Sequence, residues 1–124
     1  MIVYQLNIDP NTKPRMTRSD KWKERPCVLQ YRDFKDELRK ECKRVGLTEL
    51  KPIIKLLTFI IPMSKSWSKK KKLEMNGKPH QQSPDIDNLE KGIFDAMLTQ
   101  DNYIWKVEEA SKIWGEEGKI ILGQ

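Results

Sequence analysis

Histidine and cysteine are scarce in this sequence, and their scarcity removes whole classes of catalytic site. The 124 residues include one histidine, His80, and two cysteines, Cys27 and Cys42. One histidine cannot form a His-rich zinc site within a single chain, and a Ser-His-Asp or Cys-His device would have to use His80. We expect His80 to lie at the surface or against a substrate rather than to act as a base.

Long apolar runs and nucleotide-binding motifs are also missing. No apolar stretch reaches the length that spans a bilayer, so we expect no membrane partner. Neither a GxGxxG nor a Walker sequence occurs. The absence of a signal-peptide pattern predicts a cytoplasmic protein with free thiols. Cys42 fits an apolar helix stripe and is predicted to pack in the core.

Charged residues are abundant and unevenly distributed. The formal net charge is +6, but residues 1–80 carry 20 basic and 9 acidic side chains, a net charge of +11. Residues 81–124 carry 4 basic and 9 acidic side chains, a net charge of −5. A basic first part indicates a polyanion partner, and an acidic last part indicates a separate acidic centre. A metal-dependent enzyme acting on nucleic acid needs both, although two halves that merely attract each other are an alternative.

Apolar periodicity predicts elements in the order β, α, β, α, β, β. The expected strands are residues 2–8, 53–61, 103–114 and 119–122, and the expected helices are residues 29–45 and 85–98. Residues 53–61 are nearly all apolar, so this strand is predicted to be central and buried on both faces. We expect a mobile loop at 65–78, an irregularity near 108–110 and a hairpin turn at 116–118. This order predicts an α/β (α+β) fold, a single domain over residues 1–124 with a small mixed β-sheet and two main helices packed on it.

Two aspartates precede the second predicted helix. Asp85 and Asp87 stand two residues apart after Pro84, and Lys91 lies one helical turn beyond Asp87 on the same face. Two carboxylates and an ammonium therefore converge at a helix N-terminus. A structural explanation is also open: Asp87 caps the helix in a capping box with Glu90, Asp85 is solvated, and Lys91 pairs with Asp87 or with Asp95, one turn further on.

Carboxylates are the chemistry that this composition leaves available. Clustered aspartate oxygens select Mg²⁺, or Mn²⁺ as a substitute, over zinc or copper. Such ions can activate water for in-line hydrolysis of a phosphodiester. Lys91 could then neutralise charge in the transition state or orient the attacking water.

Basic residues gather in two segments outside this helix. The first is an extended stretch that continues to Trp22, and the second is a lysine run that leads towards the aspartates. Basic residues beside an aromatic suit phosphate contact and base stacking, whereas a solvated charged surface is the alternative. The residues that we expect to contact DNA are Lys13, Arg15, Arg18, Lys69, Lys70, Lys71 and Lys72.

Four motifs occur in a fixed order along the chain: Lys13-Pro14-Arg15-Met16-Thr17-Arg18, Ser66-Trp67-Ser68, Pro84-Asp85-Ile86-Asp87-Asn88-Leu89-Glu90-Lys91 followed by Asp95-Ala96, and Lys112-Ile113-Trp114-Gly115. In order and approximate spacing they resemble the RusA family of Holliday junction resolvases. The resemblance implies a small, homodimeric, Mg²⁺-dependent endonuclease of DNA recombination and repair, bacterial or phage-encoded, that resolves four-way junctions by paired nicks. It also implies that Asp85 and Asp87 are metal ligands and that Lys91 is the catalytic lysine.

The resemblance implies a third acidic residue after the helix. The family has an Asp-Asp pair there, and this chain has Gln100-Asp101, so the metal-ligand and catalytic role passes to Asp101. Glu108 or Glu109 would take that role if the loop is aligned differently. Asp95 also fits the family pattern, and we expect it to orient Lys91 rather than to bind metal.

Two other functions remain as alternatives. One is a non-catalytic basic DNA-binding module whose aspartates only cap a helix. The other is a metal-dependent nuclease or phosphatase without a preference for junctions. Symmetric cutting of a junction needs two related carboxylate clusters, which predicts a homodimer with two-fold symmetry. The apolar residues Trp105, Val107 and Ile113 offer material for its interface.

Overall fold

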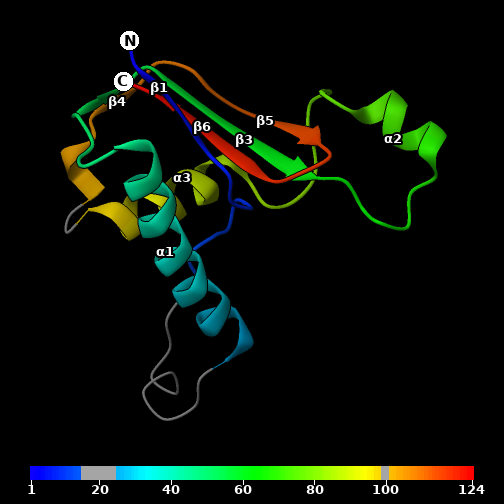
Figure 1. The fold of residues 1–124 in the computed structure, drawn as a ribbon, viewed down its shortest axis with the longest axis horizontal. Coiled ribbons are helices and arrows are strands. Elements are labelled where there is room, and N and C mark those ends of the chain that lie inside the picture. The colour runs from blue at the N-terminus through cyan, green and yellow to red at the C-terminus, as the bar shows by residue number, and fades with distance from the viewer. Residues whose placement is uncertain (15–24, 99–100) are drawn as a thin grey trace.

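The computed structural model describes residues 1–14, 25–98 and 101–124, the last range without the side chain of Asp101. Its elements are β1 (Val3–Leu6), α1 (Pro26–Val45), β2 (Ile53–Ile54), β3 (Leu56–Pro62), α2 (Lys69–Met75), α3 (Ile86–Met97), the short 3-10 helix η2 (Asp101–Tyr103), β4 (Lys106–Val107), β5 (Ala110–Gly115) and β6 (Lys119–Gly123). Figure 1 shows the sheet with α1 and α3 on one side and α2 projecting beyond the end of the strands.

A four-stranded mixed sheet carries the rest of the structure. Its strand order is β1-β6-β3-β5, in which β3 pairs with β5 in parallel and with β6 antiparallel. A separate parallel pair joins β2 to β4. The predicted central position of the 53–61 segment is therefore confirmed for β3, as are the mixed sheet and the α+β class.

The predicted hairpin at residues 116–118 is wrong. These residues connect β5 to β6, but the two strands are not neighbours, because β3 lies between them. Local turn residues indicated a hairpin, whereas the apolar β3 takes partners on both sides and separates the two strands. The predicted irregularity is present: the strand region is broken at Glu108–Glu109, between β4 and β5.

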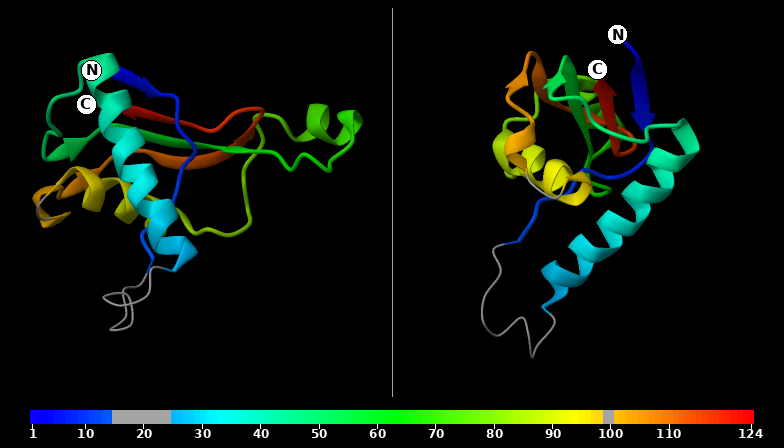
Figure 2. Two further views of the ribbon diagram at one scale, coloured as in Figure 1. Left: turned by 60° about the horizontal axis from the view of Figure 1, so that its bottom comes forward. Right: turned by 90° about the vertical axis from the view of Figure 1, so that its left-hand side faces the viewer.

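Helices α1 and α3 cover one face of the sheet (Figure 2). Alternate strand residues such as Leu57, Phe59 and Ile120 face these helices and are fully buried. Helix α1 contributes an apolar stripe that includes Cys42, which confirms its predicted place in the core. The helix ends at Gly46, whose φ of 77° lets its amide cap the last carbonyls in the left-handed conformation.

The opposite face of the sheet is less covered. Thr58 and Ile60 alternate with the buried residues of β3 and are half-exposed, as is Ile121 on β6. Their register places Ile121 beside Thr58, and Ile113 on β5 beside Ile60. The sheet therefore keeps a partly apolar face that α1 and α3 do not cover.

The expected mobile loop at 65–78 contains a helix instead. Ser68 supplies an N-cap for α2, since its Oγ accepts a hydrogen bond from the Lys71 amide at 3.2 Å. The sequence pattern concealed this helix because its residues are lysines with no apolar period, and the cap and local hydrogen bonds define it. Within the described residues, no helix is long and apolar enough to cross a membrane.

The backbone of Asn11 and Thr12, just before the first basic segment, crosses α3 at Gly92. The Tyr31 hydroxyl donates to the Gly92 carbonyl at 2.9 Å, and the Lys13 ammonium lies 3.3 Å from the Asp95 carboxylate. A Cβ added at Gly92 would collide with the carbonyl oxygen of Asn11 and lie 3.3 Å from the Cα of Thr12. The absence of a side chain at position 92 therefore permits this backbone to lie on the helix.

Gly92→Ala should destabilise the protein, although alanine is usually the better residue inside a helix by about 0.5–1 kcal/mol. Here the added methyl must displace the backbone of Asn11, and overpacking of this kind costs about 1–3 kcal/mol. Urea unfolding measures the difference, with Asn88→Ala on the exposed side of the same helix as the control. A Gly92→Ala protein as stable as the parent would contradict the close packing described here.

Candidate active site

Asp85 and Asp87 lie at the beginning of α3, as expected, but their helical positions differ from the prediction. Asp85 is the N-cap residue, with extended backbone angles, and its carbonyl accepts a hydrogen bond from the Leu89 amide at 3.2 Å. Asp87 lies inside the first turn. The predicted capping box of Asp87 with Glu90 is therefore wrong, because Pro84 restricts only the residue before it and the helix begins directly after Asp85.

The charged groups at this helix start have no ion-pair partner among residues 1–14, 25–98 and 102–124. Asp85, Asp87 and Lys91 are all exposed. Among the described residues, neither carboxylate accepts a hydrogen bond or pairs with a cation, and Lys91 pairs with no carboxylate. Asp95, which we expected to orient Lys91, pairs with Lys13. The structural explanation, a side-chain cap with an internal ion pair, is absent from this part of the chain.

A shallow groove of about 420 Å³ runs beside these residues. One wall is formed by α3 and the other by residues 104–107, where Trp105 has 69% of its surface exposed. Asp87, Glu90 and Lys91 bring their charged groups to the α3 wall. Burial, together with the negative charge of Asp87, raises the pKa of Glu90. A cation bound here would therefore relieve unfavourable negative charge.

The donor set has the oxygen chemistry that Mg²⁺ prefers. Asp85 and Asp87 offer two carboxylates, but the described residues contain no group of three or more His, Cys, Asp or Glu side chains arranged around one point. The backbone of Asp101 lies in η2, which packs against α3, while its side chain lies outside the described residues. Of the alternative third ligands, Glu108 pairs with Lys106 at 3.6 Å, and both Glu108 and Glu109 are exposed.

Lys112 belongs to one of the four sequence motifs but had no predicted role of its own. In the structure it makes two hydrogen bonds close to the aspartate pair. Its ammonium donates to the carbonyl oxygens of Gln82 and Pro84, at 2.5 Å and 2.6 Å. Pro84 directly precedes Asp85, so a side chain from β5 holds the backbone at the point where the aspartate pair begins. Sequence alone could not pair the two segments, because the contact joins residues far apart in the chain.

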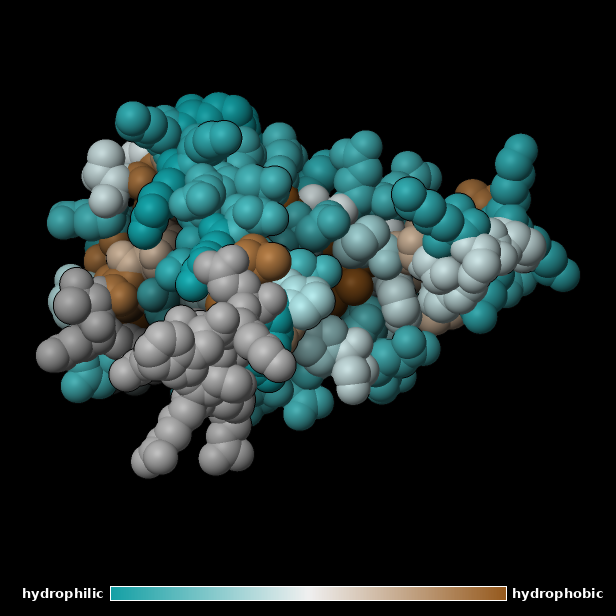
Figure 3. Space-filling model, turned by 90° about the horizontal axis from the view of Figure 1, so that it is seen from below, coloured by the Kyte–Doolittle hydropathy of each residue, from teal (hydrophilic) through white to brown (hydrophobic). Residues whose placement is uncertain are grey.

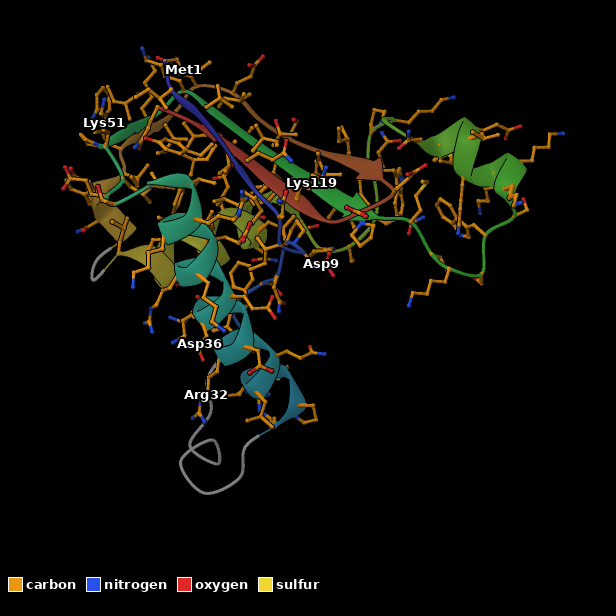
Figure 4. All side chains as sticks on the ribbon, viewed as in Figure 1. Met1, Asp9, Arg32, Asp36, Lys51 and Lys119 are labelled. Carbon is orange, nitrogen blue, oxygen red and sulfur yellow. The ribbon has the colours of Figure 1, made fainter. Side chains whose placement is uncertain are left out.

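The predicted DNA-contacting residues have separate positions. Lys13 lies on α3 through its ion pair with Asp95. Arg15 and Arg18 lie outside the described residues. Lys69 to Lys72 occupy α2, whose side chains Figure 4 shows at the projecting end of the molecule, and the Lys71 ammonium lies 4.1 Å from the centre of the Trp67 ring. His80 differs from its prediction, because it is buried, with 4% of its surface exposed.

This α+β domain presents two carboxylates and a lysine at a helix start, without ion-pair partners in the described part of the chain, beside basic surfaces; these are features of a phosphodiester-cleaving nuclease. Comparison with known families is decisive on this point: the family described as Endodeoxyribonuclease RusA matches residues 6–121. The chain belongs to this family and is an endodeoxyribonuclease, with the Holliday junction resolution that the family implies. No match was found among curated proteins or among solved structures.

Lys112→Met should reduce cleavage of junction DNA by about 10–100-fold, the usual cost of losing a group that orients catalytic ligands. The affinity for the junction without metal should stay within about twofold of the parental value, because Lys112 lies behind the aspartate pair and not on an exposed basic segment. Lys112→Arg keeps the positive donor and should restore part of the activity. A Lys112→Met enzyme with parental cleavage rates would show that the two hydrogen bonds do not position the site.

Proposed function

We propose that this chain is a Mg²⁺-dependent, structure-selective endonuclease that resolves four-way DNA junctions by paired symmetric nicks. The observation that supports the proposal is the set of unpaired charges at the start of α3, in a chain whose family is a family of endodeoxyribonucleases. Exposed carboxylates that make no side-chain cap and pair with no cation among the described residues are available to bind a metal ion.

In this proposal Asp85, Asp87 and Asp101 would hold Mg²⁺, with Mn²⁺ as a possible substitute. When bound, the ion supplies Lewis acidity that favours ionisation of water and stabilises charge on the leaving oxygen. Lys91 lies one turn along the helix, where its ammonium attracts the scissile phosphate and offsets the charge that develops on it. Hydrolysis is complete when water oxygen has bonded to phosphorus and the bond to the leaving oxygen has broken.

The non-catalytic DNA-binding module is the weaker alternative. It requires the aspartates to serve the helix, and in the structure Asp85 makes no side-chain cap while Asp87 lies inside the first turn. A nuclease without junction preference differs from our proposal only in substrate. Competition between a four-way junction and linear duplex of the same sequence distinguishes those two activities.

Asp85→Asn and Asp87→Asn should each lower cleavage of a labelled mobile junction to background, while junction binding stays near the parental level. An amide keeps the shape of the side chain but loses the charge that a metal ligand needs. Cleavage assays with Mg²⁺ and with EDTA, together with binding measured in EDTA, separate the two effects. Asn caps helices about as well as Asp, so retained cutting in both variants would exclude the metal-site assignment.

We further propose that the working unit is a two-fold symmetric homodimer. One chain offers one carboxylate pair, whereas resolution requires cuts in two strands of like polarity. The uncovered sheet face, with Ile60, Ile113 and Ile121 half-exposed, offers apolar surface for a second copy. Trp105 is exposed and Val107 is half-buried, so the apolar residues proposed from sequence are accessible only in part.

Mixed dimers of parental and Asp87→Asn chains should nick a supercoiled cruciform plasmid without resolving it. Each mixed dimer has one competent site, so the product is a nicked circle where the parental dimer gives linear DNA. Gel electrophoresis after a single binding event measures the ratio of the two products, with unmixed parental dimer as the control. Linear product from mixed dimers, or a DNA-bound monomer in sedimentation, would refute the dimer.

A further inference from the structure

The segment between β3 and α3 forms a projecting arm, which we define as residues 64–79 and which includes α2. Every α2 residue is exposed or half-buried, and Figures 1 and 2 show the helix standing clear of the sheet and the other helices. The arm therefore adds no core to the protein. A projecting element that adds no core is a candidate surface for contact with another molecule.

Aromatic contacts join the arm to the sheet. The Trp67 ring lies 4.8 Å from the Trp114 ring at an interplanar angle of 54°. The Trp114 ring lies 4.2 Å from the ring of buried His80 at an interplanar angle of 51°. Burial and the nearby Lys112 lower the pKa of His80. On the other side, the Lys71 ammonium lies 4.1 Å from the centre of the Trp67 ring. These four side chains form a continuous series of contacts from the sheet to the helix.

Both ends of the arm are also tied to the end of β5 by backbone hydrogen bonds. The amide of Met63 donates to the Gly115 carbonyl at 3.0 Å, at the start of the arm. At its end, the Gly77 amide donates to the Trp114 carbonyl at 2.8 Å, and the Trp114 amide donates to the Lys78 carbonyl at 2.9 Å. Together with the aromatic contacts, these bonds hold both ends of the arm to the sheet.

The surface of the arm is strongly basic around one exposed apolar side chain. Its sequence carries a single acidic residue, Glu74. Its basic residues are Lys65, Lys69, Lys70, Lys71, Lys72 and Lys78. Leu73 directly follows the lysine run and has 81% of its surface exposed, more than any other large apolar side chain of the described chain. Figure 3 shows this narrow end of the molecule covered mainly by hydrophilic side chains, with hydrophobic atoms among them.

We propose that the arm probes the branch point of the junction: its lysines contact phosphates of one DNA arm, and Leu73 packs against the bases exposed where stacking is interrupted. Apolar wedges set among basic residues bind DNA in this way, because unstacked bases offer an apolar face and phosphates offer the charge. Continuous duplex has no interrupted stack, so Leu73 favours branched DNA. This inference rests on the proposed function, since it assigns the structural selectivity of the same enzyme.

The charge of the arm favours DNA over a protein partner. A second copy of this chain could receive the arm only at an acidic surface, and one exists in the groove of about 750 Å³ lined by Asp9, Asp33, Glu37, Glu116 and Glu117. We commit to DNA because a branch point offers phosphates to the lysines and exposed base faces to Leu73 at the same place. Docking of the arm on a second copy is therefore the competing outcome of the test.

The test uses binding in EDTA, without cleavage, to a four-way junction that carries 2-aminopurine at the branch point. With the parental dimer we expect fluorescence to rise as the base is unstacked. Leu73→Ala should abolish most of that rise and weaken junction binding about tenfold, while duplex binding changes by less than about twofold. Leu73→Met keeps an apolar wedge and should restore the signal. Leu29→Ala is the matched control, because Leu29 is also exposed but lies on α1.

Two further variants separate the attachment of the arm from its charge. Trp67→Ala removes the aromatic contacts but keeps every lysine, so it should lower the 2-aminopurine signal while leaving the salt dependence of binding unchanged. Replacement of Lys69 to Lys72 by alanine should flatten that dependence by up to about 0.9 log units per log unit of salt for each lost phosphate contact. An unchanged salt slope would show that these lysines contact no phosphate and would overturn the proposal.

The remaining outcomes are decisive in the same way. Parental fluorescence and junction affinity in Leu73→Ala would overturn the role of the wedge. If Leu73→Ala or the replacement of Lys69 to Lys72 made the protein monomeric in sedimentation while DNA binding stayed intact, the arm would belong in the acidic groove of a second copy. That result would also overturn the proposal. If Asp85→Asn and Asp87→Asn still cut junctions while Leu73→Ala loses the branch-point signal, the metal site fails and the arm proposal stands.

Discussion

The ammonium of Lys112 connects the sheet to the loop that precedes α3. By donating to two carbonyls just before Asp85, it fixes where the loop ends and therefore where α3 begins. The position of the aspartates follows from that starting point, since residues of a helix have fixed relative directions. Lys91 then takes its place one turn further on. In our proposal Lys112 does not contact DNA, yet it helps to position Asp85, Asp87 and Lys91, which act on the DNA backbone.

The start of α3 also shows why charge alone did not settle the function. Acidic residues at helix starts usually stabilise the helix through the dipole or through a cap. Here the N-cap aspartate accepts no side-chain bond, and Lys91 finds no acidic partner in the described part of the chain. Stability that these groups could have supplied is not used, which is typical of functional sites.

Sequence predicted most of the fold, and the failures have physical causes. Apolar patterns found α1, α3, the central strand and the break before β5, because each depends on which residues are buried. The helix α2 was missed because a cap and local hydrogen bonds stabilise it without burial. The partners of β5 and β6, the burial of His80 and the contacts of Lys112 were missed because each joins segments distant in sequence. For the candidate site, sequence gave Asp85, Asp87 and Lys91 as neighbours but misplaced the N-cap by two residues.

The parallel pairing of β3 with β5 has a consequence for how the nuclease matures. The crossover between these strands contains the arm, the loop held by Lys112 and α3, so the proposed metal ligands and the arm lie between two strands that pair with each other. Parallel pairing closes a long loop, which makes it intrinsically slow to form. In our proposal, the relative placement of the aspartates and the arm therefore depends on a contact between strands that are distant in sequence.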